Sequence, residues 1–492
     1  MTKTFKFMKE DFKSSLHPLK TNLIMAEYHG VEISKYIYEN ILSDDFSNDN
    51  FLPQQTVYAT KPKGHLRRTV KLDPVAEYFI YDLVLRNKTI FRPQISNTRR
   101  SFGYRMIGDT VIPVHEAYAE YKSHLSDCAI KHKHNLQFDI ASYFNSVYHH
   151  DLSHWFASKG ISEVDNKAAG KYFREINAGR SIDFLPQGIY PCKMIGNEFL
   201  KMIDSFGTLK STHVVRFMDD FTLFDDNPNI LKQDFAKIQK LLGKYALNIN
   251  PSKTYYDNKV EDLQTKLTHI QQSLQEIVTD YEEVIEASGV ELEIQFLEEN
   301  SLSAGQAEGL MKLLKDDDLE ESEADLILGF LRHHSDDLME LLPILLARFP
   351  NLIKHIYSVC AGIKDKESLA SIIFDYLSSE TDFLEYQLFW LGSILEDYLQ
   401  GTILYGSCLI KIFELSVDYR ISKAKILEIP ELGFGLKEIR DEYLKTGQSD
   451  WLSWSSAIGS RALPKAERNY SLGYFAKCSP MNFLISSCVK KI

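Results

Sequence analysis

The chain has 492 residues, of which 44% are apolar and 12% aromatic, and these values are typical of a soluble protein with two or three folded domains. Its six cysteines show no paired short spacing and no apolar run is long enough to span a bilayer, so we expect no disulfide framework, zinc site or membrane span. No apolar segment follows the first lysines, so no secretion signal is expected and the protein should be cytoplasmic.

The formal net charge of −12 is distributed unevenly along the chain. Residues 1–260 contain 35 Lys and Arg against 29 Asp and Glu, whereas residues 261–492 contain 21 against 39. The basic excess is greatest in residues 51–105, with 11 basic residues against three acidic ones. Contact with a phosphate backbone is therefore expected from the first half of the chain.

Three segments of different character follow one another. Residues 1–50 have the spacing of amphipathic helices and end in a polar loop, so they predict an N-terminal helical extension. Residues 51–256 alternate between strand and helix patterns, which predicts an α+β domain. Residues 257–492 have helical periodicity with short polar joins, which predicts an all-helical domain of stacked helix pairs.

The α+β segment carries acidic residues on two apolar runs. Phe138-Asp139-Ile140 ends an extended run, and Asp219-Asp220 lies between two alternating apolar runs, at the tip of a predicted β-hairpin. Between them Leu185-Pro186-Gln187-Gly188 predicts a turn before a helix. A strand beside the hairpin would bring Asp139 to the acidic pair, and three close carboxylates repel one another unless divalent cations bind. Alone, the pair also fits a solvated turn.

In this order the acidic segments and the turn resemble motifs A, B and C of reverse transcriptases, the right-hand-shaped RNA-directed DNA polymerases. Flanking segments agree with this resemblance. Lys63-Gly64-His65-Leu66-Arg67-Arg68 resembles the basic fingers motif, Ser101–Arg105 the element that follows it, and Leu247–Thr254 motif D. The resemblance covers roughly residues 55–256. It implies fingers and palm in residues 51–256, followed by an all-α, HEAT-like domain in residues 257–492.

The resemblance implies an enzyme that adds deoxynucleotides by two-metal-ion nucleotidyl transfer. Asp139, Asp219 and Asp220 are implied as catalytic carboxylates, and Asp139, Ile140, Asp219 and Asp220 as ligands of two Mg²⁺ ions. Lys253 is either a general acid that protonates the leaving pyrophosphate or a surface lysine after a turn.

The residues implied to contact the incoming deoxynucleotide are Lys63, Arg67, Arg68, Phe144, Gln187 and Gly188. Adjacent residues on a strand face opposite sides, so either Arg67 or Arg68 can reach the triphosphate. The ring of Phe144 is either a steric gate that excludes a ribose 2′-OH or part of the palm core. Gln187 and Gly188 either shape the floor under the nascent base pair or form an ordinary surface turn.

Differences from the common reverse transcriptase motifs suggest a subgroup of that family. Cys192-Lys193 stands where many relatives carry Ser-Pro, and nothing after residue 256 resembles the usual thumb, RNase H or maturase segments. This pattern resembles bacterial defence-associated and abortive-infection reverse transcriptases. It implies an antiphage role, with a noncoding-RNA template or untemplated synthesis, and with an RNA, DNA or protein-tyrosine primer.

The partners expected from this interpretation are dNTPs, an RNA template, a DNA product and further copies of the chain in a homo-oligomer. Two other functions stay open: a retron- or intron-type reverse transcriptase, and an inactive RNA-binding scaffold. The intact Asp139, Asp219 and Asp220 disfavour the scaffold, because a scaffold does not need acids that repel one another.

Overall fold

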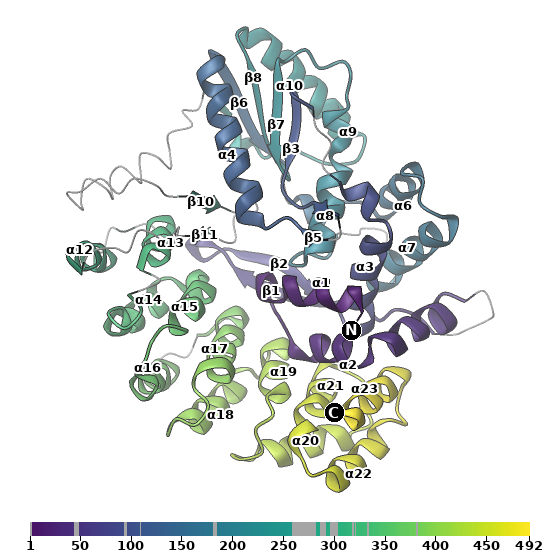
Figure 1. Ribbon diagram of the computed structural model, residues 1–492, viewed down its shortest axis with the longest axis vertical. Helices are drawn as coiled ribbons and strands as arrows, with labels where there is room; N and C mark the ends of the chain where they lie inside the picture. The colour runs from purple at the N-terminus through teal and green to yellow at the C-terminus, as the bar shows by residue number, and fades with distance from the viewer. Residues whose placement is uncertain are drawn as a thin grey trace. The chain divides into compact units, whose positions relative to one another are not determined.

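The structure is a computed structural model that describes residues 2–43, 49–92, 96–108, 110–180, 185–257, 282–285, 292–295, 304–316, 319, 321–331, 334–379 and 382–492 (Figure 1). The chain divides into two compact units: unit 1 consists of residues 1–49, 54–79 and 301–492, and unit 2 of residues 50–53 and 80–300. The predicted divisions at 50 and 256 do not coincide with these units, because residues 54–79 pack with both ends of the chain. Within the described ranges, no helix is long and apolar enough to cross a membrane.

Unit 2 contains a five-stranded sheet with the order β3-β7-β8-β6-β9. Its strands are β3 (Arg99–Phe102), β6 (His134–Asp139), β7 (His213–Phe217), β8 (Asp220–Asp225) and β9 (Tyr255–Tyr256). β7 and β8 form an antiparallel hairpin, β6 lies antiparallel beside β8, and β3 lies parallel beside β7. The hairpin and its neighbouring strand were both predicted from alternating apolar residues, and the sheet confirms them.

Helices pack on both faces of this sheet (Figure 1). On one face, the α4 face, the ring of Phe217 lies 5.1 Å from that of Tyr118 and 5.6 Å from that of Tyr121. On the opposite face, the α10 face, the ring of Phe138 lies 5.1 Å from that of Phe235. The helices of unit 2 are α4 (Val114–Lys131), α5 (Tyr143–Ser146), α6 (His149–Ser158), α7 (Glu163–Ile176), α8 (Tyr190–Phe199), α9 (Lys201–Asp204) and α10 (Pro228–Gly243).

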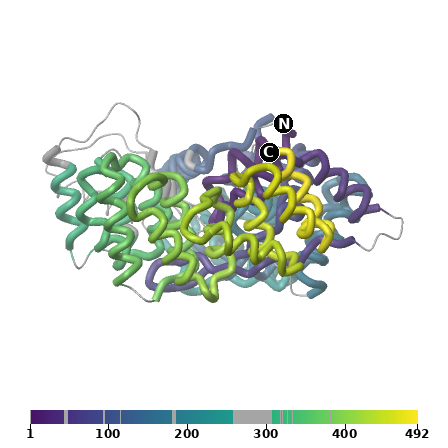
Figure 2. The backbone as a smooth tube through the Cα atoms, turned by 90° about the horizontal axis from the view of Figure 1, so that it is seen from below, coloured from purple at the N-terminus to yellow at the C-terminus, as the bar shows by residue number. Residues whose placement is uncertain are grey.

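Unit 1 joins the two ends of the chain. Helix α2 lies beside the last helix, α23 (Figures 1 and 2), where the Cys488 thiol donates to the Ile24 carbonyl at 3.8 Å and Lys491 pairs with Glu32. The first elements of unit 1 are α1 (Lys3–Asp11), α2 (Lys20–Tyr36), a π-helical turn (Ile37–Ile41), β1 (Gln55–Thr60), β2 (Leu66–Lys71) and α3 (Pro74–Arg86), which continues into unit 2.

The C-terminal part of unit 1 is an array of helices in two rows. Helices α13, α15, α17, α19 and α21 contact one another in sequence, and α14, α16 and α18 do the same. This arrangement is typical of stacked helix pairs. The array consists of α12 (Ala304–Leu314), α13 (Glu321–Phe330), α14 (Leu342–Arg348), α15 (Ile353–Cys360), α16 (Lys366–Ser379), α17 (Glu385–Tyr398), α18 (Tyr405–Leu415), α19 (Arg420–Glu428), α20 (Leu436–Lys445), α21 (Trp451–Gly459), α22 (Lys465–Phe475) and α23 (Pro480–Lys491).

Two short strands precede the helical array. β10 (Glu282–Ile285) pairs antiparallel with β11 (Leu292–Gln295). The prediction of helix throughout residues 257–492 therefore does not hold for these strands, whose β-branched Val284, Ile285 and Ile294 favour extended backbone.

A buried charge cluster attaches the start of α2 to the helical array. Lys425 Nζ lies 2.5 Å from Glu396 and 3.1 Å from Glu428, and all three side chains are at most 2% exposed. The Glu428 carboxylate also accepts hydrogen bonds from the backbone N–H groups of Lys20 at 3.0 Å and Thr21 at 2.7 Å, so it caps the N-terminus of α2. Burial lowers the pKa of Lys425, but the charges of Glu396 and Glu428 outweigh burial and hold this pKa above its ordinary value.

We predict that Glu428→Ala lowers the free energy of unfolding by about 3–5 kcal/mol, because it removes a helix cap and one of the two carboxylates that pair with the buried Lys425. Glu467→Ala is the control: its ion pair with Lys437 is 40% and 43% exposed, and its loss should change stability by about 1 kcal/mol or less. Urea unfolding followed by circular dichroism measures both, and equal effects of the two substitutions would contradict the prediction.

Candidate active site

The sheet of unit 2 brings three acidic residues together at one end of the β7–β8 hairpin. Asp139 is the last residue of β6 and lies opposite Asp220, the first residue of β8. Asp220 also lies opposite Phe217, the last residue of β7. Asp219 lies in the turn that joins β7 to β8. Because partners across an antiparallel pair place their side chains on the same face, Asp139 and Asp220 both lie on the α4 face with Phe217.

The electrostatics of this cluster are dominated by burial and like charge. Burial raises the pKa of Asp220 well above its ordinary value, and the charges of Asp219 and Asp139 raise it further. Lys253 Nζ lies 2.9 Å from Asp139 Oδ2. Burial lowers the pKa of Lys253, but the hydrogen bond to Asp139 and the nearby carboxylate charges outweigh burial and raise it overall. The predicted catalytic residues Asp139, Asp219, Asp220 and Lys253 therefore form one interacting group.

The turn that carries Asp219 is held from the α10 face. Met218 has a φ of 54°, a left-handed conformation that costs energy for a residue other than glycine. Its carbonyl accepts a hydrogen bond from Arg216 Nη1 at 3.1 Å. The Arg216 side chain is fully buried and binds the Asp204 carboxylate of α9 through Nε at 2.9 Å and Nη2 at 2.7 Å. It also donates to Asn197 Oδ1 of α8 at 2.7 Å, so one guanidinium ties both helices to the turn.

Helix α8, which follows the predicted motif B turn, also packs closely on the other motifs. The Tyr143 hydroxyl donates to the Gly196 carbonyl at 2.8 Å, and a Cβ added at Gly196 would lie 3.2 Å from Tyr143 Cε1 and 3.5 Å from Met218 Cε. A side chain at Gly196 would therefore require the Tyr143 ring to shift by a few tenths of an ångström. Gly188 is buried with a φ of 110°, which only glycine adopts readily, so the predicted turn is tightly constrained.

The predicted nucleotide contacts fall in both units. Phe144, Gln187 and Gly188 belong to unit 2 with the carboxylates. Phe144 is 5% exposed, and its carbonyl accepts a hydrogen bond from the Leu185 N–H at 2.9 Å, which joins motif A to motif B. Gln187 is half-buried. Their roles beside a nucleotide stay predictions.

The three predicted basic contacts belong to unit 1. Lys63 is exposed in a turn with a φ of 60°, and its backbone N–H donates to the Glu321 carboxylate at 2.9 Å. On β2, Arg67 is buried and Arg68 is half-buried, as expected for neighbours on a strand. Their contact with a triphosphate also stays a prediction.

Arg216, Asn197 and Asp204 were not among the predicted site residues. The signal for Arg216 was present in the sequence, because an arginine in the apolar strand Val214–Phe217 must be paired when that strand is buried. Asp204 and Asn197 carry no comparable signal, since their role follows from how α8 and α9 pack on the sheet.

The carboxylates have the chemistry of a divalent-cation site. Within the described part of the chain, no three His, Cys, Asp or Glu side chains already converge as a metal site. The donor set nevertheless suits Mg²⁺, which prefers carboxylate oxygens. Asp139 Oδ1 is buried and has no hydrogen-bond partner among the described residues, so it is available as a ligand. The side chain of Ile140 is apolar and buried, so only its carbonyl oxygen can contribute.

Comparison with known proteins gives one family match. Residues 86–268 match the family described as reverse transcriptase (RNA-dependent DNA polymerase). No curated protein matches the chain. Apo telomerase from Candida tropicalis is similar over 80% of this chain and 71% of that chain, with 14% identity and a TM-score of 0.33. Telomerase from Candida albicans in complex with a telomeric RNA fragment is similar over 88% and 69%, with 14% identity and a TM-score of 0.30. These TM-scores are too low to add to the family match.

Residues 86–268 therefore form a reverse transcriptase domain, and the class of enzyme that this domain defines is an RNA-directed DNA polymerase. All three predicted acidic residues, the motif B turn and Lys253 fall inside the matched residues, whereas the basic residues Lys63, Arg67 and Arg68 precede them.

We predict that Arg216→Lys lowers the rate of dNTP incorporation by about ten- to a hundredfold, because an ammonium group cannot replace the planar fork that holds Asp204, Asn197 and the Met218 carbonyl. Arg100→Lys is the matched control, since Arg100 is 33% exposed and its ion pair with Glu120 lies at the surface. Incorporation and circular dichroism are measured for both variants. A parental rate in a folded Arg216→Lys protein would show that the turn does not need this contact.

Proposed function

We propose that this polymerase adds deoxynucleotides by two-metal-ion nucleotidyl transfer centred on Asp139, Asp219 and Asp220. The observation that carries the proposal is the sheet register, with Asp139 opposite Asp220 and Asp219 in the adjoining turn. The raised pKa of Asp220 and the buried Asp139 Oδ1 support it, because both are relieved by a bound cation. When bound, two Mg²⁺ ions would favour ionisation of the attacking hydroxyl and neutralise the leaving pyrophosphate.

In this proposal Lys253 donates a proton to the leaving pyrophosphate. Its side chain is 54% exposed and therefore accessible, and its raised pKa keeps the ammonium protonated at neutral pH. The ion pair with Asp139 supports a place in the site rather than on a remote surface.

The remaining predicted contacts orient the deoxynucleotide. We assign Lys63, Arg67 and Arg68 to the triphosphate, Gln187 and Gly188 to the floor under the nascent base pair, and Phe144 to the exclusion of a ribose 2′-OH. The support for Phe144 is its place within motif A, five residues after Asp139, and its backbone contact with Leu185 of motif B.

The biological role that we propose is bacterial antiphage defence, with a noncoding-RNA template or untemplated synthesis primed by RNA, DNA or a tyrosine hydroxyl. The support is Cys192-Lys193 in motif B and the helical array after the palm, as in the subgroup that the sequence resembles. A retron- or intron-type enzyme is the alternative. Sequencing the nucleic acid that copurifies with the protein distinguishes them: a retron or intron RNA would contradict the defence role.

The helical array is proposed to act in assembly. Residues 261–492 contain 21 basic against 39 acidic residues, and this charge disfavours direct contact with a phosphate backbone. We therefore expect the chain to form a homo-oligomer in solution. Light scattering that finds a monomer at micromolar concentration would contradict this expectation.

We predict that Asp219→Ala combined with Asp220→Ala abolishes Mg²⁺-dependent incorporation of radiolabelled dNTPs while the protein stays folded, because the hairpin turn loses its carboxylates but none of its strand hydrogen bonds. Asp226→Ala is the matched control, since this acid lies just beyond β8 and its side chain is 63% exposed. Parental incorporation by the double variant would overturn the polymerase centre. No incorporation by the parental protein would favour the RNA-binding scaffold.

We predict that Phe144→Val reduces the preference for dNTPs over rNTPs, because a smaller side chain leaves room for a 2′-OH. The volume lost also removes core packing at a residue that is 5% exposed, so thermal unfolding is measured alongside incorporation. Unchanged discrimination by a folded, active Phe144→Val protein would place this ring in the core and the gate elsewhere.

A further inference from the structure

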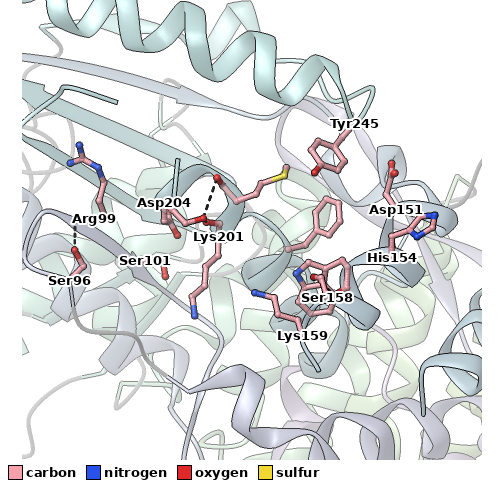
Figure 3. Close-up of a pocket in the computed structure, with 14 residues that line it drawn as sticks. Ser96, Arg99, Ser101, Asp151, His154, Ser158, Lys159, Lys201, Asp204 and Tyr245 are labelled. Carbon is pink, nitrogen blue, oxygen red and sulfur yellow. Dashed lines mark hydrogen bonds between the residues drawn. The ribbon is translucent and has the colours of Figure 1, made fainter. Parts of the chain in front are cut away.

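Unit 2 has a cavity of about 710 Å³, within the size range of small-molecule sites (Figure 3). We call it the back pocket; its lining includes Ser101, Trp155, Lys159, Phe199, Lys201 and Tyr245. In the sheet, Ser101 of β3 lies opposite Arg216 of β7, and Arg216 lies opposite Phe221 of β8. Phe221 in turn lies opposite Phe138 of β6. These residues share the α10 face, so the back pocket and the catalytic carboxylates lie on opposite faces of the sheet.

One wall of the back pocket is cationic. The amino groups of Lys159 and Lys201 extend toward the same part of the cavity (Figure 3). Lys201 is buried and pairs with Glu198. Burial lowers the pKa of Lys201, the Glu198 carboxylate opposes this shift, and the charges of Arg216 and Lys159 lower the pKa further. Two carboxylates also line the pocket: Asp204 is bound by Arg216, and Asp151 lies beside His154, away from the two amino groups (Figure 3).

A second wall is aromatic. The ring centroid of Phe199 lies 6.3 Å from that of Trp155 and 5.7 Å from that of Tyr245, so the three rings are in contact. Trp155 and Tyr245 are half-buried. Trp155 Nε1–H is buried and has no acceptor among the described residues. Lys159 Nζ lies 5.6 Å from the Trp155 ring, so the cationic and aromatic walls adjoin.

We propose that the back pocket binds one nucleotide unit, with its base against the aromatic wall and its phosphate against Lys159 and Lys201. A simple anion would leave the three rings unused, and an apolar ligand would make no use of the ammonium groups of Lys159 and Lys201, whereas a nucleotide matches both walls. This nucleotide can be a free molecule or one position of a single-stranded nucleic acid, because the same side chains would recognise both.

The test measures calorimetric binding of dAMP and of a single-stranded oligodeoxyadenylate to the full chain in EDTA, which suppresses cation-dependent binding at the carboxylates. Lys159→Ala should weaken binding about tenfold, the loss of one charge-assisted contact. Lys159→Arg should retain binding. Lys167→Ala is the control, since Lys167 is 75% exposed and pairs with Glu163 on α7.

Ser158→Trp provides a second variant that removes no core side chain. Ser158 is exposed and lines the back pocket, so a large ring at this position should occupy part of the cavity and weaken binding. Weaker dAMP binding in Lys159→Ala and Ser158→Trp supports a free-nucleotide site, and weaker binding of the oligonucleotide alone supports a single-strand site.

Absence of binding by either probe, or binding that Lys159→Ala and Ser158→Trp leave unchanged, would overturn the proposal. Incorporation of dNTPs by the same variants is measured in parallel. Because the back pocket and the carboxylates lie on opposite faces of the sheet, incorporation should remain at the parental rate. A failure of the back-pocket proposal is therefore distinguishable from a failure of the polymerase centre, which is tested by the Asp219 and Asp220 substitutions.

Discussion

The geometry of the turn that carries Asp219 depends on one buried guanidinium. Arg216 is fully buried, and a buried arginine is strongly destabilising unless its N–H groups have acceptors. Its acceptors come from three places: Asp204 on α9, Asn197 on α8 and the Met218 carbonyl in the β7–β8 turn. Displacing any of these elements would leave a charged donor without its acceptor. The left-handed Met218 conformation is therefore fixed by contacts made outside the turn, and Asp219 takes its position from them.

In the group of three carboxylates, by contrast, like charges repel one another. Asp139, Asp219 and Asp220 carry like charges, and the pKa of Asp220 is raised by burial and by its two acidic neighbours. Lys253 offsets part of this repulsion through Asp139. Hydrogen bonds along β6, β7 and β8 impose the close approach, so the fold tolerates the repulsion because backbone pairing and the Arg216 contacts stabilise the same arrangement. A fold that holds repelling acids together is a typical feature of functional sites.

Local patterns predicted the palm well and the long-range packing poorly. Alternating apolar residues around Asp219-Asp220 predicted the hairpin, and Asp139 was correctly placed on the neighbouring strand. Periodicity also predicted helices after residue 304. It could not predict that Glu428 caps α2, since the two elements are about 400 positions apart and the contact follows from tertiary packing. For the same reason residues 54–79, predicted as part of the middle domain, pack in unit 1.

Adjacent side chains on β7 point to opposite faces of the sheet, so two neighbouring residues contact two different surfaces. Phe217 faces α4 with the carboxylates, and Arg216 faces α8 and α9 with the back pocket. Asp204 lines the back pocket and is also the carboxylate that Arg216 binds. A continuous series of polar contacts therefore runs from the wall of the back pocket through Asp204 and Arg216 to the Met218 carbonyl, one residue before Asp219. Any change at the back pocket that displaced α9 would act on the β7–β8 turn through the ion pair of Asp204 with Arg216, because the sheet between the two faces is fixed by its strand pairing.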